Sequence, residues 1–462
     1  MSLLQDLKTT PRLGILTGIT AAAVGIIYGY DMSNIAGALG FLEIEFDLST
    51  QALEQITTAV VIGEVLGALI GGWLANKVGR RTAMIGVATG YALFAILSAL
   101  APTVPVLYVA RLLLGLTIGV SVVVVPVFVA ESSPAKIRGA LLVAYQVTTV
   151  IGVILGYVIA YFLSGAGNWR MMLGLAAVPA VVVLLIVVRL PDTPRWYMMK
   201  GREEEARNVL NRIEGEGSLN VATELAQMSR SLREESGGAI REMLRKPFLR
   251  ASIFVVGLGF FIQITGINAI VYYSPKLFAL MGFEGHASQL LLPALVQGVS
   301  LIAVFFSLSL VDRIGRRPIL LGGIGTMIAA NILLIAIFLI SDDFGGILTA
   351  LGFTGVLLFT VGFTFGFGAL VWVYAGESFP AHLRALGSSA MLTSDLLANV
   401  VVSMFFLSML QQLGGAGTFM VFGTLAVLAF IFVLRMAPET KGRNLEDIRE
   451  FWENGGRWEV KN

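Results

Sequence analysis

The sequence predicts an all-α membrane protein in which twelve transmembrane helices form two six-helix repeats, with both termini in the cytoplasm. Three observations support this prediction. First, 56% of the 462 residues are hydrophobic and 13% are charged, whereas soluble globular proteins carry about 25% charged residues. Second, apolar runs of about 20 residues, the length that spans a bilayer, recur along the chain. Third, short motifs in the first half return in the second half.

Apolar runs of spanning length occur six times before a long polar stretch and six times after it. They lie near residues 14–37, 56–75, 82–101, 105–129, 139–163, 171–190, 250–272, 289–311, 319–340, 348–374, 385–410 and 417–436. The first run follows a polar N-terminus and lacks the short apolar core and small-residue cleavage site of a signal peptide. We therefore expect it to be retained as a membrane span.

The distribution of charge gives the domain boundaries and the orientation. The predicted parts are an N-terminal six-helix bundle at 1–190, a cytoplasmic helical linker at 191–249, a C-terminal six-helix bundle at 250–437 and a cytoplasmic tail at 438–462. The connections that follow odd-numbered spans contain two basic residues, Arg170 and Lys276. Because lysine and arginine accumulate in cytoplasmic loops, the other side of the membrane is predicted to be the cytoplasm.

Three pairs of motifs show that the second half repeats the first. The paired segments are 76–81 with 312–317, 131–138 with 377–384, and 191–195 with 438–442. Members of the first pair share Gly-Arg-Arg, and members of the second pair begin with Glu-Ser and end with Arg. Two six-helix halves in parallel repeat predict a substrate site between them, near the bilayer midplane.

With these motifs the sequence resembles the sugar porter family of the major facilitator superfamily over nearly its whole length. The most specific segments are Gly29-Tyr30-Asp31 in the first span, Gln263-x-x-Gly266-Ile267-Asn268-x-x-x-Tyr272-Tyr273 in the seventh, and the Pro-Asp-Thr-Pro-Arg and Pro-Glu-Thr-Lys-Gly segments after the sixth and twelfth. The resemblance implies the major facilitator fold. It also implies a transporter of a hexose, pentose or polyol, either facilitative or driven by protons.

Asp31 and Arg111 are charged residues inside apolar spans. A carboxylate at the centre of a membrane helix costs about 2.5–3.5 kcal/mol on insertion scales, so Asp31 needs a partner or a function. The resemblance implies that Asp31 and Arg111 form the proton switch of a proton-coupled transporter. A permanent ion pair between two spans is the alternative.

Polar side chains within the spans are the candidate ligands of a neutral, polyhydroxylated substrate, since amides both donate and accept hydrogen bonds. The resemblance implies that Gln146, Gln263, Asn268, Trp372 and Asn399 bind the substrate and that Tyr272 and Tyr273 are gating residues. Hydrogen bonds between helices are the alternative role for these side chains.

Asp395 and Glu64 are carboxylates in the spans that the resemblance leaves unexplained. Asp395 stands where the family usually has an amide, and we include it among the predicted substrate-binding residues. It could bind a substrate hydroxyl, bind a cationic substrate or titrate as a second proton site. The simpler alternative is a structural carboxylate that neighbouring serines such as Ser394 hold in place. Glu64, between Gly63 and Gly67, could lie on a proton path or pair with a backbone donor.

A third group of charges lies at the predicted cytoplasmic ends of the spans. The resemblance implies that these residues form salt bridges that hold the two halves together when the inside is closed. They are Arg80, Glu131, Arg138, Arg195, Arg316, Glu377, Arg384 and Glu439. The alternative is the ordinary excess of basic residues in cytoplasmic loops. That excess would explain the loop arginines but not the glutamates that are paired with them.

Other classes of function find no support in the sequence. The chain has no cysteine and two histidines, so a zinc site is not expected. Its glycine-rich stretches lack the lysine and hydroxyl of a phosphate-binding loop. We expect no cofactor, no nucleic-acid partner and no enzymatic activity.

The leading prediction is a transporter that imports a small sugar or polyol by proton symport. We expect it to be a multi-pass, monomeric protein of a bacterial inner (plasma) membrane. The alternatives are a facilitative uniporter and a proton-coupled exporter of drugs or metabolites.

Overall fold

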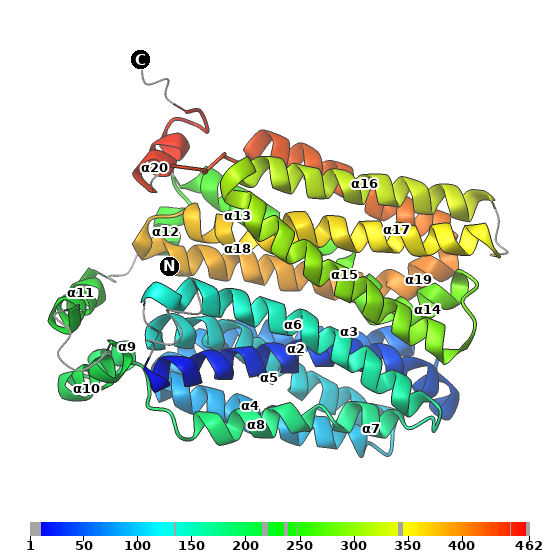
Figure 1. The fold of residues 1–462 in the computed structure, drawn as a ribbon, viewed down its shortest axis with the longest axis horizontal. Helices are drawn as coiled ribbons and strands as arrows, with labels where there is room; N and C mark the ends of the chain where they lie inside the picture. The colour runs from blue at the N-terminus through cyan, green and yellow to red at the C-terminus, as the bar shows by residue number, and fades with distance from the viewer. Residues whose placement is uncertain are drawn as a thin grey trace. The chain divides into compact units, whose positions relative to one another are not determined.

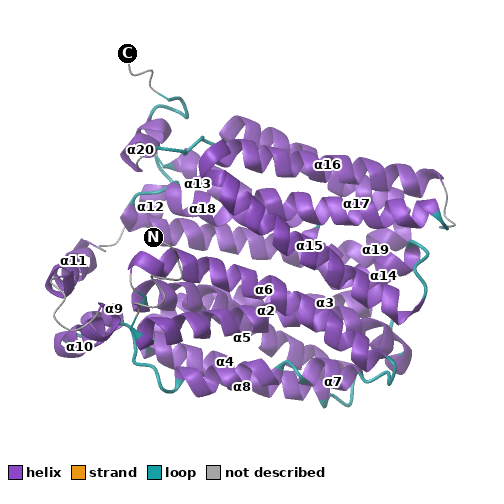
Figure 2. Cartoon of the chain, in the orientation of Figure 1, coloured by secondary structure: helices purple, strands orange, loops and turns teal. Residues whose placement is uncertain are grey.

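A computed structural model describes residues 11–133, 135–214, 220–234, 239–246, 248–340, 345–443 and 445–458. Every regular element in this part of the chain is a helix, as the sequence predicts (Figure 2). The chain divides into two compact units. The N-terminal unit comprises Met1–Asp47 and Ala59–Glu235, and the C-terminal unit comprises Leu48–Thr58 and Ser236–Asn462.

The N-terminal unit contains the helices from α2 to α11 (Figure 1). They are α2 (Arg12–Phe46), most of α3 (Thr50–Val78), α4 (Arg80–Ala99), α5 (Val104–Ser132), α6 (Ala135–Ser164), α7 (Trp169–Gly174), α8 (Ala177–Val187), α9 (Pro194–Met199), α10 (Glu203–Glu214) and α11 (Asn220–Glu234). The last two are amphipathic helices that share a small apolar cluster.

The C-terminal unit contains the first residues of α3 and the helices from α12 onward. These are α12 (Ala239–Met243), α13 (Leu249–Ile264), α14 (Ile267–Leu280), α15 (Gly285–Ile314), α16 (Arg316–Ile340), α17 (Ile347–Phe363), the π-helical turn η1 (Thr364–Gly368), α18 (Ala369–Glu377), α19 (Ala381–Met436) and α20 (Leu445–Glu453). Although α3 is one continuous helix, its first turns therefore pack with the C-terminal unit and the rest with the N-terminal unit.

Eleven helical segments of the described chain are long and apolar enough to cross a membrane. The longest is the Leu383–Met436 part of α19, which has 54 residues. Its backbone leaves the helical conformation at Gly414, where φ is 68° and ψ is 178°, so two helices meet there. The chain is thus a multi-pass membrane protein, and one of the eleven segments is long enough to supply two spans.

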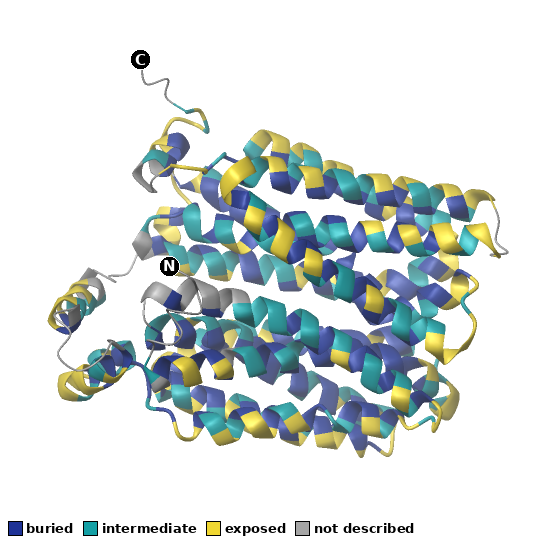
Figure 3. Cartoon of the chain, viewed as in Figure 1, coloured by how far each residue is buried: buried dark blue, intermediate teal, exposed yellow. Residues whose placement is uncertain are grey.

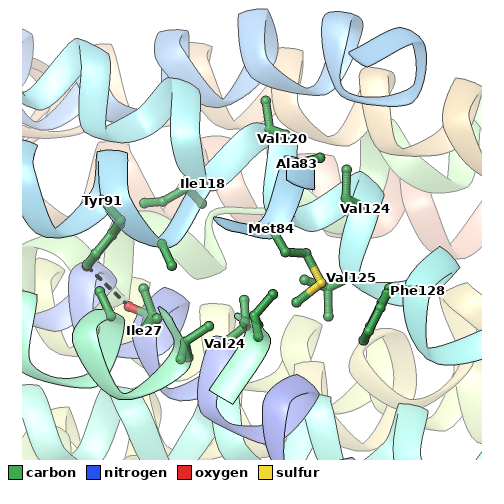
Figure 4. Packing of buried hydrophobic residues seen from close by; sticks show 14 of the residues in the cluster. Val24, Ile27, Ala83, Met84, Tyr91, Ile118, Val120, Val124, Val125 and Phe128 are labelled. Atoms are coloured by element: carbon green, nitrogen blue, oxygen red, sulfur yellow. Dashed lines mark hydrogen bonds between the residues drawn. The ribbon is translucent and has the colours of Figure 1, made fainter. Parts of the chain in front are cut away.

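Close helix contact in the N-terminal unit depends on glycines. Lipid is as apolar as a leucine side chain, so membrane helices associate through tight packing rather than through the hydrophobic effect. A β-carbon at Gly115 would collide with the backbone of Val60, and one at Gly119 with the backbone of Glu64. These glycines let α5 lie directly against α3. A buried apolar cluster that includes Val24, Met84 and Ile118 fills the neighbouring space (Figures 3 and 4).

The C-terminal unit has two breaks that shape its interior. The α13–α14 segment is interrupted at Gly266, whose φ of 101° is favourable only for glycine. The π-helical turn η1 widens the α17–α18 segment, and Gly366 in this turn lies against Gly323 of α16. The first break lies against Phe422 of α19, and the second lies against α16.

The glycine contact between α3 and α5 predicts a stability difference. Gly115→Ala places a methyl group against the Val60 backbone and should destabilise the protein by about 1–3 kcal/mol, the usual cost of overpacking. The matched control is Gly86→Ala on α4, because no atom lies within 4 Å of a β-carbon there. We expect a lower melting temperature in detergent for the first variant alone, and equal melting of the two variants would contradict the packing argument.

Candidate functional site

A buried ion pair joins α2 and α5 in the N-terminal unit. Arg111 Nη1 donates to Asp31 Oδ1 over 2.9 Å, and both side chains are almost completely buried. Tyr91 on α4 also hydrogen-bonds the Asp31 carboxylate. The structure therefore brings together the two residues that the sequence analysis assigned to proton coupling, and it adds a tyrosine that no sequence signal indicated.

The packing of α2 explains why Asp31 lies in this interior position. A β-carbon at Gly29 would collide with the backbone carbonyl of Thr149, so α2 and α6 are in close contact just before Asp31. The neighbouring Tyr30 donates its hydroxyl to the backbone carbonyl of Met172 over 2.9 Å. A buried ion pair is costly to break by removing one partner, about 3–5 kcal/mol, because the other charge is left unpaired. Protonation removes the charge of Asp31, so the neutral side chain no longer needs an ionic partner.

The C-terminal unit holds a polar cluster, which we define as Gln263, Asn268, Tyr272, Asp395 and Asn399. Asp395 and Asn399 lie one turn apart on α19, and Asn268 and Tyr272 lie one turn apart on α14. The Asn399 Nδ2 donates to Tyr272 Oη over 3.2 Å, and the Gln263 side chain hydrogen-bonds Asp395. The break at Gly266 separates Gln263 from Asn268 and lets both residues join the cluster.

Four buried atoms of the polar cluster have no hydrogen-bond partner within the described part of the chain. They are Gln263 Oε1, Asn268 Nδ2, Asp395 Oδ1 and Asn399 Oδ1. Buried polar groups in native proteins are nearly always paired, so an unpaired set at one place suits a ligand. Three acceptors and one donor match a ligand rich in hydroxyl groups, since each hydroxyl both donates and accepts.

The other predicted substrate and gating residues lie in different surroundings. Gln146 is half-buried on α6 of the N-terminal unit, next to the half-buried Tyr145. Trp372 on α18 is 47% exposed. Tyr273 is buried, donates its hydroxyl to the Ser403 carbonyl over 2.7 Å and stacks on Phe406. The predicted roles of Gln146, Trp372 and the two tyrosines stay predictions.

A salt-bridge group of the N-terminal unit surrounds Glu131. Arg80 binds both carboxylate oxygens of Glu131, at 3.0 and 3.2 Å, and Arg195 lies 3.9 Å away. Thr193 donates its hydroxyl to Glu131 over 2.6 Å. The side chain of Arg138 lies outside the described side chains, so its predicted place in this group is untested.

The equivalent group of the C-terminal unit surrounds Arg316. This arginine pairs with Asp312 at 2.9 Å and with Glu377 at 3.7 Å. Glu439 accepts hydrogen bonds from the backbone amides of Arg316 and Arg317. Arg384 is half-buried in the first turn of α19. These ion pairs lie within one unit, and the expectation that such bridges hold the two halves together stays a prediction.

Asp192 is a structural residue that the sequence analysis did not single out. Its carboxylate accepts hydrogen bonds from the backbone amides of Arg80 and Thr193, at 3.0 and 2.8 Å. Gly79 has a φ of 100°, and a β-carbon there would collide with the Asp192 carboxylate. Asp192 thus caps the start of α4, as Glu439 caps the start of α16 beside Gly315. Burial raises the pKa of the Asp192 carboxyl, and this outweighs the opposing hydrogen bonds from Thr193, Arg81 and Arg80.

The raised pKa of Asp192 predicts a pH dependence of stability. A carboxyl whose pKa is higher in the folded protein stabilises the fold below its unfolded pKa and loses this contribution as the pH rises. The melting temperature of the wild type relative to Asp192→Asn should therefore fall as the pH rises from about 4, the ordinary pKa of aspartate. Thermal melts in detergent at several pH values measure this difference, and a difference that grows with pH would contradict the assignment.

Comparison with known proteins places this geometry in context. The profile of the family described as "Sugar (and other) transporter" matches residues 17–452. The chain is 35% identical to the galactose-proton symporter of Escherichia coli K12 over 93% of this chain and 92% of that protein. It is 31% identical to the arabinose-proton symporter of the same organism over 96% and 94% of the two chains. The structure matches the major facilitator superfamily proton:xylose symporter XylE from E. coli with a TM-score of 0.79 and 25% identity, over 96% of this chain and 99% of that one.

Proposed function

The chain belongs to the sugar transporter family of the major facilitator superfamily, and from this membership we propose that it imports a small sugar or polyol by proton symport through alternating access. Such a protein is a membrane transporter and not an enzyme. The buried pair of Asp31 and Arg111 is the observation that carries the proton coupling. The relatives named as proton symporters of galactose and arabinose support the same assignment.

The proton step follows from the ion pair. While Arg111 contacts Asp31, the carboxylate is neutralised and does not need a proton. When a conformational change separates the two side chains, a bare carboxylate in an apolar interior is unfavourable, and Asp31 binds a proton instead. A membrane potential of 100 mV supplies about 2.3 kcal/mol per charge, which corresponds to about fiftyfold accumulation of a neutral sugar.

The polar cluster supplies the recognition of the sugar. Its unpaired acceptors and its unpaired Asn268 amide would bind hydroxyl groups of the substrate, and Asp395 would accept from one of them. Gln146 and Trp372 complete the proposed set, the tryptophan by covering an apolar face of the sugar ring. Tyr272 is tied to Asn399 and so connects a gating residue to the binding residues.

The proposed topology has twelve spans with both termini in the cytoplasm. It takes α19 as two spans that meet at Gly414, which adds one to the eleven segments. The side richer in lysine and arginine is the cytoplasmic one. We place the protein in a bacterial inner (plasma) membrane, as a monomer. Facilitative uniport and export are less favoured, because uniport needs no buried charge at Asp31.

Replacement of the proton-binding carboxylate should uncouple transport. Asp31→Asn is expected to abolish concentrative uptake of galactose or xylose into energised proteoliposomes while preserving exchange of labelled for unlabelled sugar. The control is Asp47→Asn, the same substitution at the exposed end of α2. Undiminished accumulation by the Asp31 variant would reject its role, and wild-type uptake that ignores an imposed pH gradient would reject symport.

The polar cluster predicts which amides bind the sugar. Galactose, arabinose and xylose should be screened for a rise in melting temperature, because a ligand that binds the folded protein stabilises it. Asn268→Ala and Asn399→Ala should weaken binding by about 1–3 kcal/mol, through loss of a buried hydrogen bond. Asn331→Ala is the matched control, since Asn331 is equally buried but lies on α16, outside the polar cluster. Equal loss of the shift in all three variants would contradict the assignment.

A further inference from the structure

A buried carboxylate near the start of α3 has no place in the mechanism described above. Glu54 is 2% exposed, and one residue of α19 binds both of its carboxylate oxygens. The backbone amide of Ser408 donates to Oε1 over 2.7 Å, and the Ser408 hydroxyl donates to Oε2 over 2.6 Å. We call these two bonds the Glu54 clasp. A buried carboxylate is costly without hydrogen-bond donors, so the clasp stabilises the contact between the first turns of α3 and α19.

The clasp lies at the end of α3 that belongs to the C-terminal unit. The helix has 29 residues, so its two ends are about 44 Å apart at the rise of an α-helix. Residues Leu48–Thr58 group with the C-terminal unit, and the rest of the helix groups with the N-terminal unit. Arg80 and its salt bridge to Glu131 follow the opposite end. In the proposed topology the Arg80 end is cytoplasmic, so the clasp lies near the outer face of the membrane.

The helix that carries Ser408 also carries part of the polar cluster. On α19, Asn399 of the cluster donates to the Tyr272 hydroxyl of α14 over 3.2 Å. One turn further along α19, the Ser403 carbonyl accepts a hydrogen bond from the Tyr273 hydroxyl over 2.7 Å. Ser408 follows within the next two turns of the same helix. The stretch of α19 from Asn399 to Ser408 thus connects the proposed sugar-binding residues to the first turns of α3.

We propose that Glu54 is a gating residue and that its clasp closes the outer side of the transporter. This inference rests on the proposed alternating access. Because α3 is one helix shared by both units, a motion that takes its first turns away from α19 must break both bonds to Ser408. Bonds to a carboxylate are about twice as strong as bonds between neutral groups. The negative charge of Glu54 therefore favours the closed outer side, and the clasp has to open before sugar enters from that side.

The test uses a single cysteine behind the clasp in the full-length protein, since the chain has no cysteine of its own. Thr58→Cys places a thiol one turn beyond Glu54 on α3, at a position that is 0% exposed. The Thr58 hydroxyl has no hydrogen-bond partner among the described residues, so its replacement loses no bond. In right-side-out membrane vesicles, a membrane-impermeant maleimide is added from outside and the rate of labelling is measured. Exchange of labelled galactose and xylose is followed in the same vesicles.

In the Thr58→Cys background, Glu54→Gln should raise the labelling rate about tenfold, the scale expected when a hydrogen bond to a charged group loses that charge. Ser408→Ala removes one of the two donors and should raise the rate to a smaller extent. The matched control is Glu284→Gln, because Glu284 is exposed just before α15, outside the clasp. Its labelling rate should equal that of Thr58→Cys alone. Retained exchange of galactose or xylose shows that the variants are folded.

Two results would overturn the gating role of Glu54. One is an equal labelling rate with and without Glu54→Gln. The other is a rise that Glu284→Gln matches, since such a rise would come from general loosening of the protein. Absence of sugar exchange in the wild type would instead overturn the proposed transport, because the labelling measurement itself does not depend on sugar.

Discussion

Charges inside a membrane protein need partners within the protein, since lipid does not solvate them. Asp31 and Arg111 satisfy each other across two helices, and their contact determines what else the N-terminal unit can do. Because the Asp31 carboxylate is stable only beside Arg111 or in its protonated form, any motion that parts the two side chains changes the protonation of Asp31.

Glycine contacts create the space in which these charges are buried. Gly29 brings α2 against α6 next to Asp31, and Gly119 brings α5 against the backbone of Glu64. Larger residues would separate the helices and admit lipid or water to the charged groups. The tight packing therefore does more than stabilise the fold. It keeps the dielectric around the ion pair low, so that the pair is sensitive to small displacements.

Much of this protein could be predicted from its sequence, because apolar runs and repeated motifs depend on local residue patterns. The helical class was accessible in this way, and the resemblance carried by the motifs gave the family and the pair Asp31 and Arg111. Tyr91 was not, since a tyrosine in an apolar span has no distinctive neighbours in the sequence and its role depends on the helix facing Asp31. The assignment of Leu48–Thr58 to the C-terminal unit was equally hidden, because α3 is continuous in sequence and in structure. Asp192 was visible within a motif, but its capping of α4 depends on a contact with a glycine far away in the chain.

The two units use polar residues of different kinds, although the sequence motifs predict that the second half repeats the first. The N-terminal unit buries the charges Asp31, Glu64 and Arg111, and the C-terminal unit buries the amides Asn268 and Asn399 of its polar cluster. Charged groups suit proton transfer, and amides suit recognition of a neutral sugar, so the proposed symport has its proton step in the N-terminal unit and most of its sugar ligands in the C-terminal unit. Asp395 is the exception, a carboxylate among amides. Its hydrogen bond from Gln263 ties it to the binding residues rather than to another charge, which favours contact with a substrate hydroxyl over a second proton site.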